Sequence, residues 1–205
     1  MGYKGKFITF EGSEGSGKST QSKLLAQYLK RKGCSVLFLR EPGGTKISEK
    51  IRKILLDHKN DSMSASCELL LYMAGRAQLV EEVIKPHLLQ GTIVICDRFL
   101  DSTVAYQGYG LGIDLGLIKY IGNFSTGGIK PDLTIFLDLP VTDGLKHRRL
   151  REDRIEKRPL SYHERVRKGY ARIAKSDPGR FKIVRVAEDK SVTQERIREL
   201  VSKII

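Results

Sequence analysis

An apolar, strand-like run near the start of the chain ends in a glycine-rich turn and then continues as a helical pattern. The segment reads FITFEGSEGSGKST over residues 7–20 and contains GxxxxGK[ST], with Gly12, Gly17, Lys18 and Ser19 at the fixed positions. The glycines allow backbone N–H groups to point inward at phosphate oxygens, and the N-terminus of the next helix adds positive potential there. This order of strand, turn and helix predicts a phosphate-binding P-loop.

In a loop of this kind the lysine reaches the β- and γ-phosphates, and the hydroxyl of the residue after it coordinates Mg²⁺. Lys18 and Ser19 occupy these two positions. We therefore expect ATP as the ligand and Mg²⁺ as the cofactor. The expected ATP-binding residues are consecutive: Gly12, Ser13, Glu14, Gly15, Ser16, Gly17, Lys18, Ser19 and Thr20.

Short runs rich in Val, Ile, Leu and Phe alternate with helical patterns along the rest of the chain. The expected strands cover residues 7–11, 35–40, 92–96, 133–138 and 181–185. The expected helices cover 18–32, 47–56, 66–90, 114–124, 142–151, 163–176 and 193–205, and a capping box of Ser191 and Gln194 begins the last. Strands that are apolar on both faces and alternate with helices predict an α/β fold, with a five-stranded parallel sheet sandwiched between helices.

The length of 205 residues fits one domain, and no linker, repeat or low-complexity tract divides it. We therefore expect a single domain over residues 1–205. The longest apolar runs are strand-sized, far shorter than a membrane span. The N-terminus has no long apolar segment with a cleavage site. These features predict a cytoplasmic protein without a membrane partner.

The formal net charge of +13 raises the possibility of nucleic-acid binding. Much of the excess falls in residues 146–158, KHRRLREDRIEKR, and elsewhere acids and bases are interspersed as on ordinary solvated helices. The chain also lacks the interleaved aromatic and basic residues typical of RNA-binding proteins. An enzyme that handles two nucleotides needs concentrated positive charge as well. We expect no nucleic-acid partner, although charge alone does not decide between the two classes.

The residues that follow the predicted strands carry polar chemistry. Arg40, Glu41 and Pro42 end the second strand, and Asp97 and Arg98 end the third. Because the carboxyl ends of parallel strands meet at one edge of a sheet, these residues should converge on the P-loop. An aspartate there can hold Mg²⁺ through water, and a guanidinium can bind phosphate in a bidentate manner. As a bare dipeptide Asp-Arg is more typical of a surface ion pair, but its position at the end of a parallel strand favours a site.

The chain lacks the motifs of other P-loop classes. It has neither the DxxG nor the NKxD of GTPases, and Asp97-Arg98 stands where helicases and AAA-type ATPases usually carry Asp-Glu. The remaining interpretation is a small kinase that transfers the γ-phosphoryl group of ATP to an acceptor near Arg98.

Six segments occur in an order that resembles the bacterial form of the thymidylate kinase family over nearly all of the chain. They are FITFEGSEGSGKST, LREPGGT, ELLLYMAGRAQLVEEVIKPHL, CDRFLDSTVAYQG, PDLTIFLDL and DRIE. The resemblance implies a nucleoside monophosphate kinase fold, Mg²⁺ dependence, commonly a homodimer, and phosphorylation of dTMP by ATP to give dTDP for dTTP biosynthesis. The runner-up is a kinase for another pyrimidine monophosphate; dUMP lacks only a methyl group, which a pocket discriminates by about 1–3 kcal/mol.

The resemblance also implies roles for residues that match the family's motifs on the acceptor side. Arg98 would grip the dTMP phosphate, Tyr72 would stack on thymine and Arg76 would donate to the base O4, although a core tyrosine with a solvent-facing arginine is the alternative for that pair. Tyr106 would crowd the sugar 2′ position, and Glu14 would bond the 3′-hydroxyl. Thr103 at thymine N3 and Pro42 at the phosphate pocket have purely local roles as alternatives. The expected dTMP-binding residues are Glu14, Arg40, Pro42, Tyr72, Arg76, Arg98, Thr103, Tyr106 and Gln107.

The basic stretch corresponds to a short, arginine-rich lid at about residues 146–158. Family members with an arginine inside the P-loop would carry it at Gly15, so its absence implies a catalytic arginine from the lid, with either Arg149 or Arg151 reaching the γ-phosphate. The expected catalytic residues are Lys18, Arg98, Arg149 and Arg151, and the expected metal site is Ser19, Asp97 and Glu14. The remaining lid residues, apart from an Arg154 that could pair with a neighbouring acid, are expected to be mostly solvated: Lys146, Arg148, Lys157 and Arg158.

Overall fold

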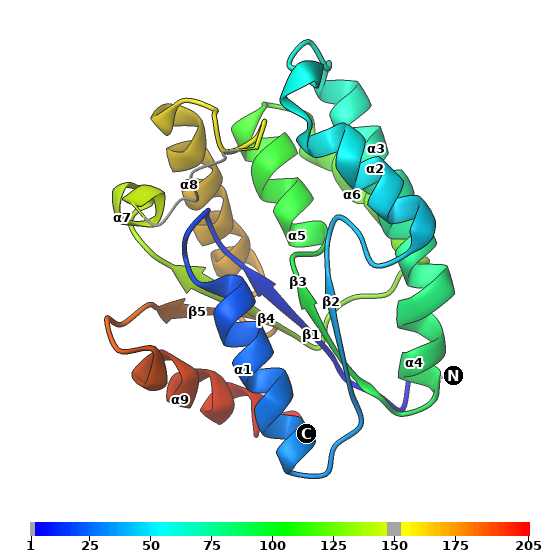
Figure 1. Ribbon diagram of the computed structural model, residues 1–205, viewed down its shortest axis with the longest axis vertical. Helices are drawn as coiled ribbons and strands as arrows, with labels where there is room; N and C mark the ends of the chain where they lie inside the picture. The colour runs from blue at the N-terminus through cyan, green and yellow to red at the C-terminus, as the bar shows by residue number, and fades with distance from the viewer. Residues whose placement is uncertain (1–2, 147–152) are drawn as a thin grey trace.

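The computed structural model describes residues 3–146 and 153–205. Within these ranges five strands form one parallel sheet in the order β2-β3-β1-β4-β5 (Figure 1). The strands are β1 (Phe7–Glu11), β2 (Val36–Arg40), β3 (Ile93–Asp97), β4 (Leu133–Asp138) and β5 (Phe181–Arg185). Three of these match the predicted ranges, and β2 and β3 differ by one residue. The predicted five-stranded parallel sheet is therefore confirmed.

Two helices cover one face of the sheet, α1 (Lys18–Arg31) and α9 (Lys190–Val201) (Figure 1). Side chains alternate along each strand, so neighbouring residues enter opposite layers. In β3, Ile93 and Ile95 pack with α1 and α9, whereas Val94 and Cys96 pack on the other face. This alternation explains why the strand sequences are apolar throughout.

The opposite face is covered by a long helical rod and by a shorter helical pair. The rod consists of α3 (Ala65–Leu79), the π-helical turn η2 (Val80–Ile84) and α4 (Lys85–Leu89). The pair consists of α5 (Leu100–Thr103), continued by the π-helical segment η3 (Val104–Gly110), and α8 (Leu160–Ser176). The remaining elements pack outside these: α2 (Lys46–Leu56), η1 (His58–Asn60), α6 (Leu115–Thr126) and α7 (Val141–Lys146).

Three points of the helix prediction need correction. The helix expected over residues 66–90 contains the π-helical turn η2, and the helical segment from Leu100 to Gly110 was not predicted at all. The capping box of Ser191 and Gln194 was wrong, because Asp189 is the N-cap and its carboxylate accepts a hydrogen bond from the Ser191 backbone N–H at 2.8 Å. Aspartate and serine are both favoured N-cap residues, and in this helix the N-cap is Asp189, two residues before Ser191.

No helix in the described ranges combines the length and the hydropathy that crossing a bilayer requires. This agrees with the absence of long apolar runs in the sequence.

Candidate functional site

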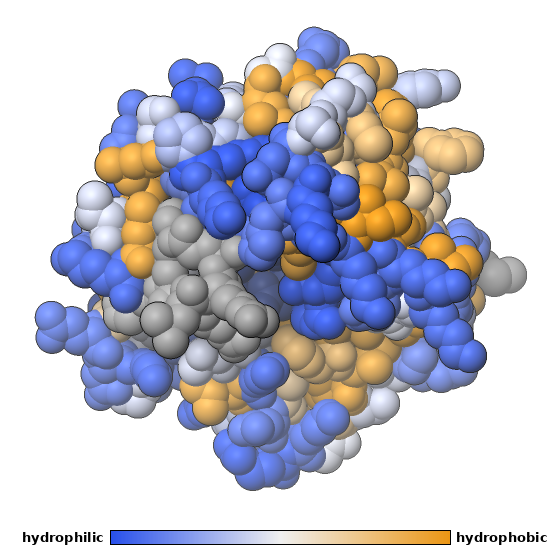
Figure 2. All heavy atoms as spheres, turned by 45° about the horizontal axis from the view of Figure 1, so that its top comes forward, coloured by the Kyte–Doolittle hydropathy of each residue, from blue (hydrophilic) through white to orange (hydrophobic). Residues whose placement is uncertain are grey.

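A deep cleft lies at the carboxyl edge of the sheet, where the connections after β1, β2, β3 and β5 meet. Figure 2 shows a hollow on this face, with hydrophilic residues along much of its rim. The cleft has a volume of about 1430 Å³, more than the roughly 300–1,000 Å³ of a typical pocket for one small ligand. It therefore has room for two ligands side by side.

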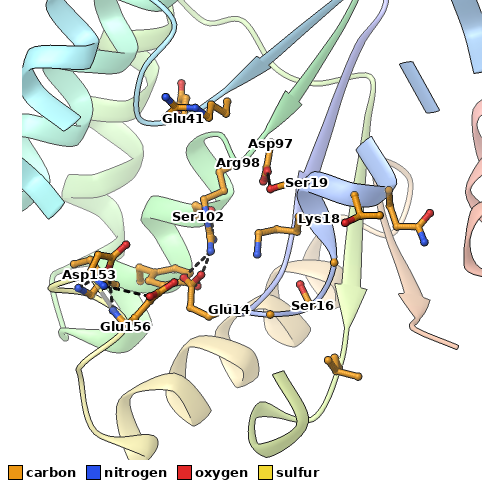
Figure 3. Close-up of a pocket in the computed structure, with 18 of the residues that line it drawn as sticks. Glu14, Ser16, Lys18, Ser19, Glu41, Asp97, Arg98, Ser102, Asp153 and Glu156 are labelled. Atoms are coloured by element: carbon orange, nitrogen blue, oxygen red, sulfur yellow. Dashed lines mark hydrogen bonds and ion pairs between the residues drawn. The ribbon is translucent and has the colours of Figure 1, made fainter. Parts of the chain in front are cut away.

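The P-loop forms one wall of the cleft, as predicted. The Lys18 ammonium donates to the Ser13 carbonyl at 2.8 Å and extends towards the space that Arg98 and Glu14 also face (Figure 3). The hydroxyls of Ser13 and Ser16 are buried and have no hydrogen-bond partner within the described residues. Buried polar atoms are normally satisfied, so these two hydroxyls fit a loop that accepts phosphate oxygens.

Gly15 explains why this P-loop carries no arginine. Its φ of 70° lies in the left-handed region, and a Cβ there would lie 2.0 Å from the carbonyl oxygen of Gly144 in α7. A side chain at this position would push α7 away from the loop. The packing agrees with the inference that any catalytic arginine comes from elsewhere.

The oxygen atoms expected to hold Mg²⁺ lie together at the end of β3. The Ser19 hydroxyl donates to a carboxylate oxygen of Asp97, which is buried at the strand end (Figure 3). A hydroxyl and a carboxylate at the phosphate side of a P-loop suit a small, hard cation. The third expected ligand, Glu14, is engaged by Arg98 instead, and within the described residues no three His, Cys, Asp or Glu side chains cluster around a common point.

Arg98 lies at the centre of the site. Its guanidinium donates to Glu14 at 2.7 Å, to the Tyr106 hydroxyl at 3.1 Å, and to the Gly12 carbonyl and the Ser102 hydroxyl at 3.2 Å each. The Tyr106 hydroxyl donates to the same Glu14 oxygen at 2.8 Å. The sequence therefore correctly predicted that Arg98 converges with the P-loop.

The charged side chains of this cluster are shielded from water, and this burial together with their mutual interactions shifts their pKa values. Burial alone would raise the pKa of Glu14, but the positive charges of Arg98 and Lys18 and the Tyr106 hydrogen bond lower it to about 2. Burial and the nearby Arg98 charge lower the pKa of Lys18 to about 8, against the opposing effect of Glu14 and Asp97. Two cations held so close in a buried space make a strong binding site for anions.

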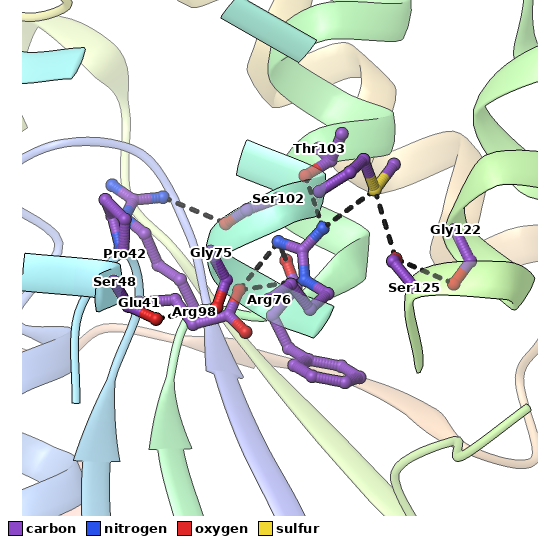
Figure 4. Close-up of polar contacts among 12 residues, drawn as sticks. Glu41, Pro42, Ser48, Gly75, Arg76, Arg98, Ser102, Thr103, Gly122 and Ser125 are labelled. Atoms are coloured by element: carbon purple, nitrogen blue, oxygen red, sulfur yellow. Dashed lines mark hydrogen bonds and ion pairs between the residues drawn. The ribbon is translucent and has the colours of Figure 1, made fainter. Parts of the chain in front are cut away.

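A second cluster surrounds Arg76 on α3 (Figure 4). Its guanidinium donates twice to Glu41, at 2.6 and 2.9 Å, and also to the Thr103 hydroxyl at 3.0 Å, the Phe99 carbonyl at 3.1 Å and the Met73 sulfur at 3.4 Å. The alternative of a solvent-facing arginine was wrong, because the side chain is 1% exposed.

The neighbours of Arg76 also face the cleft. Tyr72 is half-buried and lines the cleft, so it is not a core tyrosine, and Gln107 lies beside Thr103 in the same wall. One carboxylate oxygen of Glu41 is buried and without a hydrogen-bond partner within the described residues. An unpaired acceptor here leaves a place for a donor from a ligand or water.

Arg40 and Pro42 line the same cleft near its opening. Arg40 is exposed and pairs with Glu49 at 3.2 Å, and the Pro42 carbonyl accepts from Arg40 at 3.2 Å and from Arg52 at 2.9 Å. Sequence reasoning missed Arg52, a half-buried cation on α2 that lines the cleft. The sequence around Arg52 intersperses acids and bases as on a solvated helix face, so only the fold could show that Arg52 faces the cleft.

Glu68 on α3 binds both the segment after residue 152 and Gln107 in the wall of the cleft. This fully buried carboxylate accepts from Arg154 and Arg158 at 2.6 Å each and from the Gln107 amide at 2.8 Å. Arg158, one of the four lid residues expected to be mostly solvated, is instead engaged by Glu68 and also donates to the Tyr162 hydroxyl at 2.7 Å. Arg154 does pair with an acid, but this acid is far away in sequence.

The other lid predictions have mixed outcomes. Lys146 and Lys157 are exposed, as expected. Arg148, Arg149 and Arg151 lie outside the described residues, so their assignments stay predictions.

Glu68→Ala is expected to destabilise the protein by about 3–5 kcal/mol, because it leaves two arginines without their buried counter-charge. Urea denaturation followed by circular dichroism measures this loss. Glu81→Ala is the control: it removes an exposed ion pair with Lys85, and such pairs contribute about 0–1 kcal/mol. A Glu68→Ala protein as stable as the control would show that the network carries little energy.

The fourth side of the cleft is formed by Val186, Ala187, Glu188 and Lys190 after β5. The Gln21 amide of α1 donates to the Lys190 carbonyl at 3.0 Å, which ties this loop to the helix that follows the P-loop. Sequence reasoning missed this wall because its four residues belong to no motif that the sequence analysis used.

Comparison with known proteins gives one consistent family. A family model described as "Thymidylate kinase" matches residues 10–197. The thymidylate kinase of Geotalea daltonii is 54% identical over 189 residues, which is 88% of each chain. That of Roseiflexus sp. is 44% identical over 209 residues, covering 95% of this chain and 92% of the relative. The crystal structure of thymidylate kinase from Ehrlichia chaffeensis superposes with a TM-score of 0.81 at 36% identity, covering 96% of this chain and 98% of that one.

Proposed function

This chain belongs to the thymidylate kinase family, and on that premise we propose how its cleft transfers the γ-phosphoryl group of ATP to the phosphate of dTMP. The observation that carries the proposal is the convergence of the P-loop and Arg98 on one cleft with room for two ligands. The family match over residues 10–197 also supports a single catalytic domain.

The donor phosphates belong at the P-loop. Backbone N–H groups of residues 12–20 and the Lys18 ammonium would hold the β- and γ-phosphates, and the orphan hydroxyls of Ser13 and Ser16 would gain partners. Ser19 and Asp97 would hold Mg²⁺, which would neutralise charge on the donor phosphates. The adenine would lie against the wall formed by residues 186–190.

The acceptor belongs on the Arg98 side. Arg98 would hold the dTMP phosphate in line with the γ-phosphate of ATP, with Glu14 beside the sugar and Tyr106 crowding its 2′ position. Tyr72, Arg76, Thr103 and Gln107 would surround the thymine, with Arg40 and Pro42 near the opening.

Arg149 and Arg151 would supply charge to the transferred phosphoryl group, a role that the sequence alone supports. Catalysis in this scheme consists of positioning and electrostatics, because phosphoryl transfer demands little covalent chemistry from the protein. We propose that the enzyme acts in the cytoplasm, where its nucleotide substrates are found.

The proposed function is tested by measuring ADP release from Mg-ATP with dTMP, dUMP, UMP, CMP and AMP in parallel, beside a reaction without acceptor. We expect fast turnover with dTMP, slower turnover with dUMP and negligible turnover with the ribonucleotides. Equal ADP release in the absence of any acceptor would identify an ATPase instead.

We further propose that the enzyme is a homodimer, as the family resemblance implies. An apolar stripe runs along α6, where Leu117, Tyr120 and Phe124 are 48%, 78% and 84% exposed at helical spacing. Leu70 on the neighbouring α3 is 55% exposed. Hydrophobic residues gather at the upper right of Figure 2, on the side where Figure 1 places α2, α3 and α6. A contiguous apolar face of this kind is typical of an interface, and a second copy of this chain is its proposed occupant.

Phe124→Lys is expected to convert the dimer to a monomer, because it places a charge on the apolar face that the proposed dimer would bury. Size-exclusion chromatography with light scattering measures the mass. Ile183→Lys is the matched control, since Ile183 is 50% exposed on the edge strand β5 and lysine is well tolerated on sheet edges. A Phe124→Lys protein that still elutes as a dimer would refute this interface.

A further inference from the structure

Glu11 is a buried carboxylate that the proposed reaction does not use directly. It is the last residue of β1, directly before the P-loop, and its side chain is 0% exposed. No cation lies within ion-pair distance of it among the described residues. It accepts instead from the Phe99 backbone N–H at 2.8 Å, the Ser102 hydroxyl at 2.5 Å and the Tyr170 hydroxyl at 2.8 Å. A buried charge satisfied only by neutral donors is costly and calls for an explanation.

The Tyr170 hydroxyl accepts from the Arg98 guanidinium at 3.5 Å, and the other two donors also adjoin Arg98. Phe99 follows it in the chain, and Arg98 has a φ of 73°, in the left-handed region that non-glycine residues avoid; it is the one non-glycine residue with a positive φ within the described ranges. Ser102 accepts from the Arg98 guanidinium at 3.2 Å while it donates to Glu11. Glu11 is therefore linked to Arg98 in two ways: through the backbone N–H of Phe99, the next residue in the chain, and through the Ser102 hydroxyl, which binds the Arg98 side chain.

We propose that Glu11 is a positioning residue that holds Arg98 in place for the acceptor phosphate, through the Phe99 N–H and the Ser102 hydroxyl. This inference rests on the proposed function of the same site. The hydrogen bonds have one direction: Arg98 donates to Ser102, and Ser102 donates to Glu11. An ionised carboxylate, which only accepts, fixes this direction, whereas a protonated one can donate back and release Ser102.

The surroundings make the ionisation of Glu11 sensitive to pH near neutrality. Burial and the charge of Asp101 raise the pKa of Glu11 to about 7, although Ser102, the Arg98 charge and Tyr170 oppose the rise. The other titratable groups around it are Lys18 on α1 and Cys96 on β3. Lowering the pH through about 7 should therefore protonate Glu11 and loosen the support of Arg98.

The experiment compares the full-length wild type with Glu11→Gln, Ser102→Ala and Thr9→Val. Glu11→Gln is expected to lower kcat/KM for dTMP by about tenfold to a hundredfold, as small displacements of a catalytic group do, and to weaken dTMP binding in calorimetry by a similar factor. The KM for ATP should stay within about twofold, because the P-loop contacts are retained. Ser102→Ala should act in the same direction with a smaller effect.

Thr9→Val is the matched control. Thr9 lies two residues earlier in β1, is also 0% exposed, and its hydroxyl is hydrogen-bonded to that of Thr134, which contacts Asp101 but neither Glu11 nor Arg98. Its kinetics should equal those of the wild type.

A pH profile separates this role from a merely structural one. Between about pH 8 and 6 the wild type should lose kcat/KM for dTMP as both Glu11 and the substrate phosphate, whose second pKa is about 6, take up protons. The Glu11→Gln profile should keep only the substrate's part.

Several outcomes would overturn the inference. An active wild type with unchanged dTMP kinetics in Glu11→Gln would refute it and leave the proposed function intact. If Glu11→Gln does not fold, unchanged dTMP kinetics in Ser102→Ala would refute it in the same way. A wild type that does not phosphorylate dTMP would refute the function itself.

Discussion

Replacing Lys18 with alanine is expected to lower turnover by at least about 10²-fold, because it removes a preorganised charge from the proposed site of the transferring phosphates. The fold should persist. Among the described residues the ammonium donates one hydrogen bond, to the Ser13 carbonyl, and burial and the Arg98 charge lower the pKa of Lys18 to about 8. Keeping this charge buried therefore costs free energy that an alanine does not cost, so the melting temperature should be no lower than that of the wild type. A coupled ADP-release assay and a thermal melt measure the two effects.

Lys30→Ala is the matched control for this substitution. Lys30 lies on the same helix, in its last turn, and is exposed to solvent. Its loss removes the same charge from the protein without touching the cleft, and turnover should be unchanged. A Lys18→Ala enzyme that retained more than about a tenth of the wild-type rate would show that the P-loop lysine is not the donor-phosphate ligand.

Much of the fold could be predicted from local patterns. The strand Leu133–Asp138 was predicted without error because an apolar run bounded by a proline and an aspartate permits little else. The P-loop was predicted because its motif requires backbone geometry that glycine adopts most readily, as Gly17 with its φ of 85° illustrates. Structural features that are determined by one short segment can be predicted from the sequence of that segment alone.

Features that depend on tertiary packing could not be predicted in this way. Glu68 binds Arg154 and Arg158, which lie more than 80 positions away, and no local spacing links an acid on one helix to arginines so distant. Glu11 looked like the last residue of an apolar strand, and its three donors come from later parts of the chain. The π-helical segments are a similar case, because a single inserted residue does not change hydrophobic periodicity enough to reveal them.

Arg98→Ala is expected to lower kcat/KM for dTMP by about 10³-fold, or about 4 kcal/mol at ~1.4 kcal/mol per decade, because it removes the proposed bidentate partner of the acceptor phosphate. The loss should affect the kinetics of the acceptor dTMP, with the KM for ATP little changed.

Arg98→Lys should recover only a small part of the lost kcat/KM. An ammonium cannot reproduce the fork that now reaches Glu14, Ser102 and the Gly12 carbonyl together. Steady-state kinetics with dTMP varied at saturating ATP measure the loss, and a decrease of less than tenfold in Arg98→Ala would contradict the assignment.

Arg98→Gly separates the chemical role of this residue from its conformational cost. The φ of 73° is strained for any residue with a Cβ, by about 1–2 kcal/mol in the left-handed region, whereas glycine adopts it freely but loses about 0.5–1 kcal/mol of chain entropy on folding. Arg98→Gly should therefore be as inactive as Arg98→Ala but more stable by about 0.5–1 kcal/mol in denaturant unfolding. A glycine variant less stable than the alanine variant would show that the turn is not strained. The expected pair of results would mean that the chain keeps an arginine where glycine fits better, and that the reason for keeping it is the phosphate that its guanidinium holds.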